Sequence, residues 1–218
     1  MRLITEAEVA AVLDPDSAVA ALRAADPAPV QEIRVRMFDT FQVLQPRKKA
    51  AHPVTIVDID EKSLADPRLG QWPWPRTRIA DIVINLTRLG AVVIAFDAVF
   101  SEPDRLNPDI AADTFSSLDE EMRTRLRQLP SNDSILADAI KSSRVVLGES
   151  GGPNVRADLN EKLPVTGFAM LGEEPQQFMV EFPGLLRNVP VLEEAAAGRG
   201  LFTIKPERDG IVRRVPMI

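Results

Sequence analysis

The chain has no cysteine, and it is poor in other residues that commonly carry catalysis. Without cysteine, disulfides, thiolate catalysis and cysteine-ligated zinc are excluded. Tyrosine is also absent, aromatic residues make up only 5% of the chain, and His52 is the only histidine. Because His52 precedes a proline in a polar stretch, with no serine or aspartate at a triad-like spacing, we expect it to be exposed and not catalytic.

Long hydrophobic runs and clusters of positive charge are missing as well. No window approaches the roughly 20 apolar residues that a membrane-spanning helix needs, and the stretch Met1 to Glu6 lacks the apolar core of a signal peptide. The formal net charge of -6 repels a phosphate backbone, so nucleic acid is not expected as a partner. Hydrophobic residues nevertheless make up 45% of the chain. The sequence as given therefore predicts a globular fold that neither enters a membrane nor exports itself.

The stretch from Val54 to Phe100 is the most informative part of the chain. Val54 to Asp60 is a short β-branched run that predicts a buried strand, and Ala91 to Phe96 predicts a second one. Between them, Arg76 to Leu89 has the periodicity of an amphipathic helix, ended by Gly90, with its apolar positions at Ile79, Ile82, Val83 and Leu86. Two such strands joined by a helix indicate a right-handed crossover between parallel strands.

Two helices are expected before this unit. One runs from Thr5 or Glu6 to Arg23 and ends because residues before proline avoid the helical region. The other runs from Val30 to Leu44 and carries an apolar stripe formed by Ile33, Met37, Phe41 and Leu44. We therefore divide the chain into a helical segment, residues 1–49, and an α/β domain, residues 50–218.

After Phe100 the sequence predicts a long polar insertion and then further elements of the sheet. A long insertion of this kind usually acts as a lid, a partner surface or a mobile loop. The expected helices are Leu118 to Leu129, Ser131 to Ser142 and Pro190 to Ala197; the expected strands are Arg144 to Glu149, Gln177 to Phe182, Leu201 to Lys205 and Ile211 to Val215. Asp209-Gly210 between the last two is a hairpin signal. The predicted fold class is α/β, with a mixed, mostly parallel central sheet flanked by helices, N-terminal helices and a C-terminal hairpin.

Acidic residues follow several of the predicted strands. Asp58 and Asp60 lie two apart on one strand, so they share a face with their Cα atoms roughly 7 Å apart. Asp97 ends the second strand and Glu149 ends the third. Because ligand crevices in parallel sheets lie beyond the carboxyl ends of the strands, these carboxylates would meet there. Such oxygen ligands suit Mg²⁺ or Ca²⁺, so Asp58, Asp60 and Asp97 form a candidate metal site.

Two interpretations of these carboxylates stay open. The Asp58-x-Asp60 spacing at a strand end resembles the start of the haloacid-dehalogenase phosphohydrolases, in which the first aspartate is the nucleophile. This sequence lacks an identifiable threonine or serine and lysine pair to complete that site. In the structural interpretation, Asp60 caps the turn that follows it, Asp97 tightens its loop, and the remaining carboxylates are solvated.

Arg76 and the two tryptophans are the other candidates for ligand contact. Arg76 lies in the first turn of its helix, where a cation opposes the macrodipole, so we expect a carboxylate partner, with Asp58 or Asp97 the nearest choice. The pair would either lock the fold or anchor a ligand. Trp72 and Trp74 would either stack on a ligand or fix the Trp-Pro turn to the core.

Four ordered motifs resemble the CHASE sensory domains of the second type. They are Val54 to Leu64, Gly70 to Arg76, Val92 to Asp97 with Phe100-Ser101-Glu102-Pro103, and Asp209 to Pro216. The similar region runs from about Arg34 to Ile218. The resemblance implies an extracytoplasmic, periplasmic input domain of a bacterial membrane receptor whose output is a nucleotide cyclase, a histidine kinase or a related signalling module. It also implies further sheet and helix after the Arg213-Arg214-Val215-Pro216 strand, and membrane helices on both sides, so we expect a part of a longer receptor.

Three functional hypotheses follow. The first is a sensory domain without catalysis of its own, a homodimer that responds to a small-molecule or protein stimulus through a crevice lined by Asp58, Asp60, Asp97 and Arg76. The second is a Mg²⁺-dependent phosphohydrolase built on Asp58 and Asp60. The third is a structural dimerisation module that uses the helices from Thr5 to Leu44.

Overall fold

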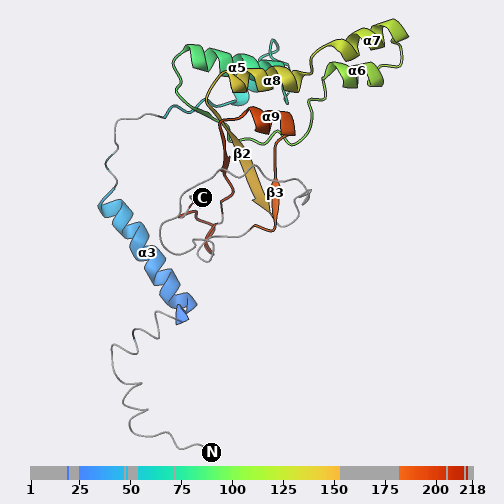
Figure 1. Ribbon diagram of the computed structural model, residues 1–218. Helices are drawn as coiled ribbons and strands as arrows, with labels where there is room; N and C mark the ends of the chain where they lie inside the picture. The colour runs from blue at the N-terminus through green and yellow to red at the C-terminus, as the bar shows by residue number, and fades with distance from the viewer. Residues whose placement is uncertain are drawn as a thin grey trace, which may run out of the picture. The chain divides into compact units, whose positions relative to one another are not determined.

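The computed structural model of the protein describes residues 19, 25–46, 48, 54–70, 72–152, 182–204, 206–213 and 215 (Figure 1). The chain divides into two compact units, Met1–Asp58 and Ile59–Ile218. Most of the predicted helix ending at Arg23 lies outside the described residues, as does the predicted strand from Gln177, apart from Phe182. Among the described residues, no helix combines the length and the apolar character needed to cross a membrane.

The first unit contains one described helix, α3 (Ala28–Leu44), as predicted. Pro29 lies in its first turn, where the missing N–H costs nothing. The predicted strand from Val54 to Asp60 is wrong, because this segment has no regular secondary structure. Most of its side chains are exposed, with Val54 at 75% and Ile56 at 87% of their full accessible surface, and only Ile59 packs against the core. A β-branched run forms a strand only where a neighbouring backbone pairs with it, and the pattern does not report on that neighbour.

The second unit alternates helices and short strands. Its helices are α4 (Glu61–Leu64), α5 (Arg76–Arg88), α6 (Pro108–Thr114), α7 (Glu120–Gln128), α8 (Asn132–Lys141) and α9 (Pro190–Ala195). Its strands are β1 (Ile94–Ala95), β2 (Val145–Gly152), β3 (Gly184–Leu186) and β4 (Gly198–Leu201). The predictions of α5, α7, α8, α9 and β2 are confirmed to within a few residues.

The sheet is built around β2, the longest strand. β1 pairs with it in parallel through Ile94 opposite Val145, and β4 pairs with it in parallel through residues 198–201. β3 pairs antiparallel with its last residues. This arrangement confirms the predicted mixed, mostly parallel sheet flanked by helices, although β1 is shorter than expected. The strand predicted from Leu201 to Lys205 is wrong except at Leu201, the last residue of β4, because residues 202–204 are not in a strand.

Helix α5 shows how the local sequence sets the boundaries of an element. Ile79 and Val83 of the predicted stripe are buried, and Ile82 and Leu86 pack against the core. Gly90 adopts a φ of 94°. Its N–H binds the carbonyl of Thr87, and the N–H of Ala91 binds that of Leu86. These are the two hydrogen bonds of a Schellman motif, so glycine at this position ends the helix.

The core lies where α5, α8 and α9 pack together with β1 and β2 (Figure 1). Its fully buried side chains are Val83, Leu136, Ile140, Val145, Leu147 and Leu192. Ser131 caps α8, as its side chain accepts a hydrogen bond from the N–H of Ser134. A close approach at Gly148 completes the packing, because a Cβ there would lie 2.6 Å from the carbonyl oxygen of Phe96. Only glycine fits at this point of β2 without displacing backbone.

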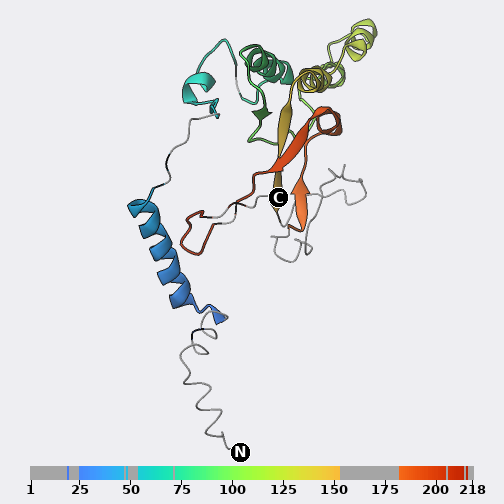
Figure 2. The same ribbon diagram turned by 60° about the vertical axis from the view of Figure 1, so that its left-hand side comes forward.

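The long insertion after Phe100 contains a helical hairpin. In both views α6 and α7 extend away from the strands (Figures 1 and 2). Arg123 of α7 donates hydrogen bonds to the carbonyl oxygens of Ala112, Phe115 and Leu118, so one guanidinium joins the two helices at their connection. Helix α7 was predicted, whereas α6 was not.

Of the predicted C-terminal hairpin, the described residues contain only the turn. Gly210 has a φ of 80°, and its N–H binds the carbonyl of Glu207. The N–H of Glu207 in turn binds the carbonyl of Ile211. Hydrogen bonds from Arg213 hold the pKa of the Asp209 carboxyl at about 2. The described residues next to this turn on either side are not in strands. The Asp209-Gly210 signal therefore predicted the turn correctly but not the pairing of two strands.

Candidate functional site: a polar cluster at two helix N-termini

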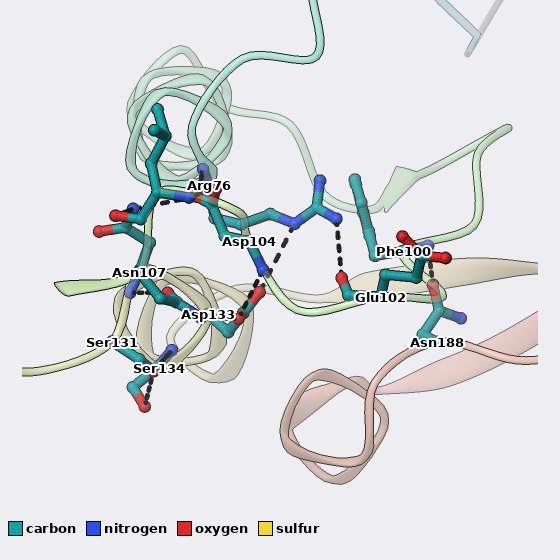
Figure 3. Close-up of polar contacts among 11 residues, drawn as sticks. Arg76, Phe100, Glu102, Asp104, Asn107, Ser131, Asp133, Ser134 and Asn188 are labelled. Atoms are coloured by element: carbon teal, nitrogen blue, oxygen red, sulfur yellow. Dashed lines mark hydrogen bonds and ion pairs between the residues drawn. The ribbon is translucent and has the colours of Figure 1, made fainter. Parts of the chain in front are cut away.

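A loop after β1 joins the N-termini of α5 and α8. It runs from Asp104 to Asn107 and follows the carboxyl end of β1, the edge at which the sequence predicted a crevice (Figure 3). The residue before α5 is Pro75, which offers no side-chain cap, and the cap of α8, Ser131, accepts from the N–H of Ser134 but not from that of Asn132. The loop supplies the missing acceptors from a distance in the sequence.

Asp104 caps α5. Its Oδ2 accepts a hydrogen bond of 2.7 Å from the backbone N–H of Arg76 and one of 3.0 Å from the side-chain amide of Asn132. Its Oδ1 accepts from the N–H of Leu106, which fixes the loop itself. A carboxylate here also compensates the positive end of the α5 macrodipole.

Asn107 performs the corresponding role for α8. Its Oδ1 accepts a hydrogen bond of 2.7 Å from the backbone N–H of Asn132, and its Nδ2 donates one of 2.7 Å to Oδ2 of Asp133. The side chain of Asn132 donates to the carbonyl of Leu106 as well. The start of α8 is therefore bound to the loop through both backbone and side chains.

Asp133 lies at the centre of the cluster. Its side chain is 6% exposed, and its Oδ2 accepts hydrogen bonds from the N–H of Asp104 and from Asn107. Its Oδ1 lies 3.6 Å from Nε of Arg76, an ion pair without a hydrogen bond. Such a buried carboxylate is stabilised by its position in the first turn of α8. Removing it would leave a buried cation uncompensated.

Phe100 extends the contacts of Arg76 toward the sheet. The Arg76 guanidinium lies 4.4 Å above the centre of the Phe100 ring and donates to the carbonyl of Glu102. The N–H of Phe100 donates to Oδ1 of Asn188, whose own amide donates to the carbonyl of Gly148 in β2. A continuous set of contacts thus runs from the start of α5 to the middle of the sheet.

A second charged group lies next to Asn188. Glu193 of α9 is buried, forms an ion pair with Arg187, and accepts a hydrogen bond from the N–H of Asn188. Glu149 of β2 forms an ion pair of 3.4 Å with Arg199 of β4. Burial raises the pKa of the Glu149 carboxyl above its ordinary value of 4.5, and the charge of Arg199 partly opposes this shift.

This raised pKa predicts a specific dependence of stability on pH. Glu149 holds its proton more tightly in the folded chain than in the unfolded chain. At low pH, Glu149 therefore increases the free energy of unfolding. That gain is lost as the pH rises from about 4.5 through the raised pKa. Glu149→Gln removes this titration. We expect the stability of the variant relative to the wild type to increase with pH across this window, measured by denaturant unfolding between pH 4 and 8.

The control for this prediction is Glu194→Gln, which changes an exposed glutamate on α9. This variant shows how the loss of one glutamate charge outside the core changes stability over the same window. A difference between Glu149→Gln and the wild type that does not vary with pH would contradict the burial of the Glu149 carboxyl.

The predicted acidic residues do not gather into a metal site in the described part of the chain. Asp60 caps α4, accepting hydrogen bonds of 2.8 Å from the N–H and 2.7 Å from the Oγ of Ser63, and these bonds lower the pKa of Asp60. Asp58, at the end of the first unit, and Asp97, just after β1, are exposed. Within the described ranges, no group of three His, Asp or Glu side chains is placed to hold a metal ion. For Asp60 the capping interpretation is confirmed, and the Mg²⁺ phosphohydrolase hypothesis gains no support.

The Arg76 guanidinium has a carboxylate partner, as its place in the helix predicted, but this partner is Asp133 and not Asp58 or Asp97. Asp104 binds the backbone N–H of Arg76 and not its guanidinium. Trp74 is 6% exposed, belongs to the core, and donates from Nε1 to the carbonyl of Gly70. Trp72 is 50% exposed and contacts the Trp74 ring edge-on, with centroids 5.6 Å apart. Of the two rings, only Trp72 is open to a ligand.

Sequence reasoning missed Asp104, Asn107, Asp133 and Asn188. The signal for Asp133 was available in Ser131-Asn132-Asp133, since an aspartate in the first turn after a serine cap favours the helix start. Asp104 and Asn107 had no such signal, because they cap helices that begin 25 or more residues away in the sequence.

Comparisons with known proteins identify the family. The family model described as CHASE2 domain matches residues 17–218. The match begins before the region whose motifs pointed to this family. Searches of curated proteins and of solved structures gave no match. The chain therefore belongs to the CHASE2 family, a family of extracellular sensory domains that are not themselves catalytic.

Proposed function

We propose that this chain is the sensory input domain of a transmembrane signalling receptor whose output is a nucleotide cyclase or a histidine kinase. The match of the CHASE2 family to residues 17–218 is the observation that carries this proposal. In the proposal the domain lies on the periplasmic face of the inner membrane, joined to membrane segments of the receptor. It responds to a small-molecule or protein stimulus and passes the change to the other side of the membrane as a homodimer.

The polar cluster supports a signalling role within this proposal. It joins the turn before α5, the loop after β1, the start of α8 and the segment before α9 through side chains that are mostly buried. A stimulus that moved one of these segments would have to break or remake contacts in the others. A ligand shifts such an equilibrium only by the difference in its affinity for the two arrangements. We propose Arg76, Asp97 and Trp72 as the residues at this edge that a ligand contacts.

The proposal is tested in the receptor, expressed with the coding sequence that flanks this chain. Asp133→Asn keeps the size of the side chain and removes its charge, so it weakens the pairing with Arg76. We expect basal cyclase or kinase output to change by about fivefold or more, the lower end of typical couplings between sites. Asp138→Asn, on an exposed position of α8, should leave the output unchanged.

Two results would count against the proposal. If the flanking coding sequence has no hydrophobic spans and no signalling domain, this chain is not part of a transmembrane receptor. Equal output from wild type, Asp133→Asn and Asp138→Asn would show that this cluster does not take part in signalling.

A further inference from the structure

Helix α3 carries an apolar stripe that is exposed along its whole length. Ile33, Met37 and Leu44 are each more than half exposed, and Phe41 is 60% exposed. A shallow groove runs along the same face and is lined by Val30, Ile33, Arg34, Met37, Phe38 and Phe41. Large apolar side chains in a continuous exposed row mark a surface that binds something.

The spacing of the stripe fits one other helix. Val30, Met37 and Leu44 lie seven residues apart, Ile33 lies between the first two, and Phe41 lies between the last two. This is the repeat of a two-helix seam, in which apolar side chains recur every 3.5 residues on average and face their counterparts in the partner helix.

The charges of α3 favour a second copy of the same helix. The helix has two acidic residues, Glu32 and Asp39, and two basic residues, Arg34 and Arg36, so it is neutral. Arg34, the cation nearest the stripe, is paired with Asp26 at 2.9 Å. Two copies therefore approach without net repulsion. A surface of anionic lipid would instead select a polar face rich in lysine and arginine, which α3 lacks.

We propose that α3 pairs with α3 of a second copy, parallel and in register, through Val30, Ile33, Met37 and Leu44. The parallel direction rests on the proposed function, because two receptor chains in one membrane carry their helices the same way up. The seam is short and falls below the area of a standard stable interface. The pair should therefore be weak in solution and strengthened where the membrane holds two copies close together.

The absence of cysteine makes a direct test of this pairing clean. Ile33→Cys, Met37→Cys and Leu44→Cys are introduced one at a time into the whole chain, with Glu32→Cys and Gln42→Cys as controls on the sides of α3 away from the stripe. Under mild oxidation, the three stripe variants should form disulfide-linked dimers about fivefold faster than the controls, because pairing raises the effective concentration of the two thiols. The readout is the dimer band in non-reducing electrophoresis.

Each alternative result overturns the proposal in its own way. Crosslinking at Met37 alone would indicate an antiparallel pair, since Ile33 would then face Phe41. Equal rates in all five variants would indicate random collision, and no crosslinking would show that another surface of the same chain covers the stripe. If the stripe variants fail to crosslink while the chain sediments with phosphatidylglycerol vesicles, a lipid surface is the occupant. None of these results bears on receptor output, so they leave the proposed function to its own test.

Discussion

Replacing Asp133 with alanine is expected to lower the free energy of unfolding by about 3–5 kcal/mol, the usual result of removing one member of a buried ion pair. The loss leaves the Arg76 guanidinium, 14% exposed, without its carboxylate. It also removes the acceptor of the Asp104 N–H and of the Asn107 amide. Chemical unfolding of the wild type and the variant measures the difference.

Two further variants test whether the effect comes from these contacts. Asp138→Ala removes an exposed carboxylate from the same helix and should cost less than about 0.5 kcal/mol. Asp133→Asn keeps one oxygen acceptor for Asp104 or Asn107 and should lose less stability than alanine does. If Asp133→Ala were as mild as Asp138→Ala, the cluster would not hold the two helix starts together.

Replacing Trp74 with alanine is expected to cost about 3–5 kcal/mol, the range for truncating a buried large aromatic side chain. Trp74 packs in the core beside α5 and β1, and its indole N–H donates to the carbonyl of Gly70 at 3.2 Å. The variant loses the buried area, this hydrogen bond and the contact with Trp72. Because a tryptophan is removed, unfolding is followed by far-ultraviolet circular dichroism.

Trp72→Ala is the matched control, since it removes the same side chain from the same turn. It should cost about 1 kcal/mol, mainly through the edge-to-face contact between the two rings. Equal losses for the two variants, or a larger loss for Trp72→Ala, would contradict the placement of Trp74 in the core. If a ligand binds at this turn, Trp72→Ala should weaken its binding by more than the small loss of stability explains.

The elements that the sequence predicted well are those whose signals are local. The periodicity of Ile79, Val83 and Leu86, followed by Gly90, marks α5 at both ends. Ser131 marks the start of α8 in the same way. In each case the hydrogen bonds that begin or end the helix lie within a few residues of the signal, so the amino-acid order contains the whole motif.

The strand predictions show where local signals fail. Val54 to Asp60 has as strong a β pattern as Val145 to Glu149, yet only the second is in a strand. β2 has partners on both sides, β1 and β4, and each is distant in the sequence. Strand propensity describes a side chain that fits a pleated surface, and the surface itself is supplied by other segments.

By itself the sequence determined the fold class, the family motifs, the boundaries of α5 and α8 and the need of Arg76 for a carboxylate, because these follow from periodicity, caps and the helix dipole. Only the tertiary structure decided which carboxylates meet that arginine. The Asp133 carboxylate reaches its guanidinium across 57 residues of chain, and Asp104 reaches its backbone N–H across 28, while the nearer candidates Asp58 and Asp97 are exposed. Contacts over such separations depend on how helices and loops pack, and no pattern within a single segment contains that information.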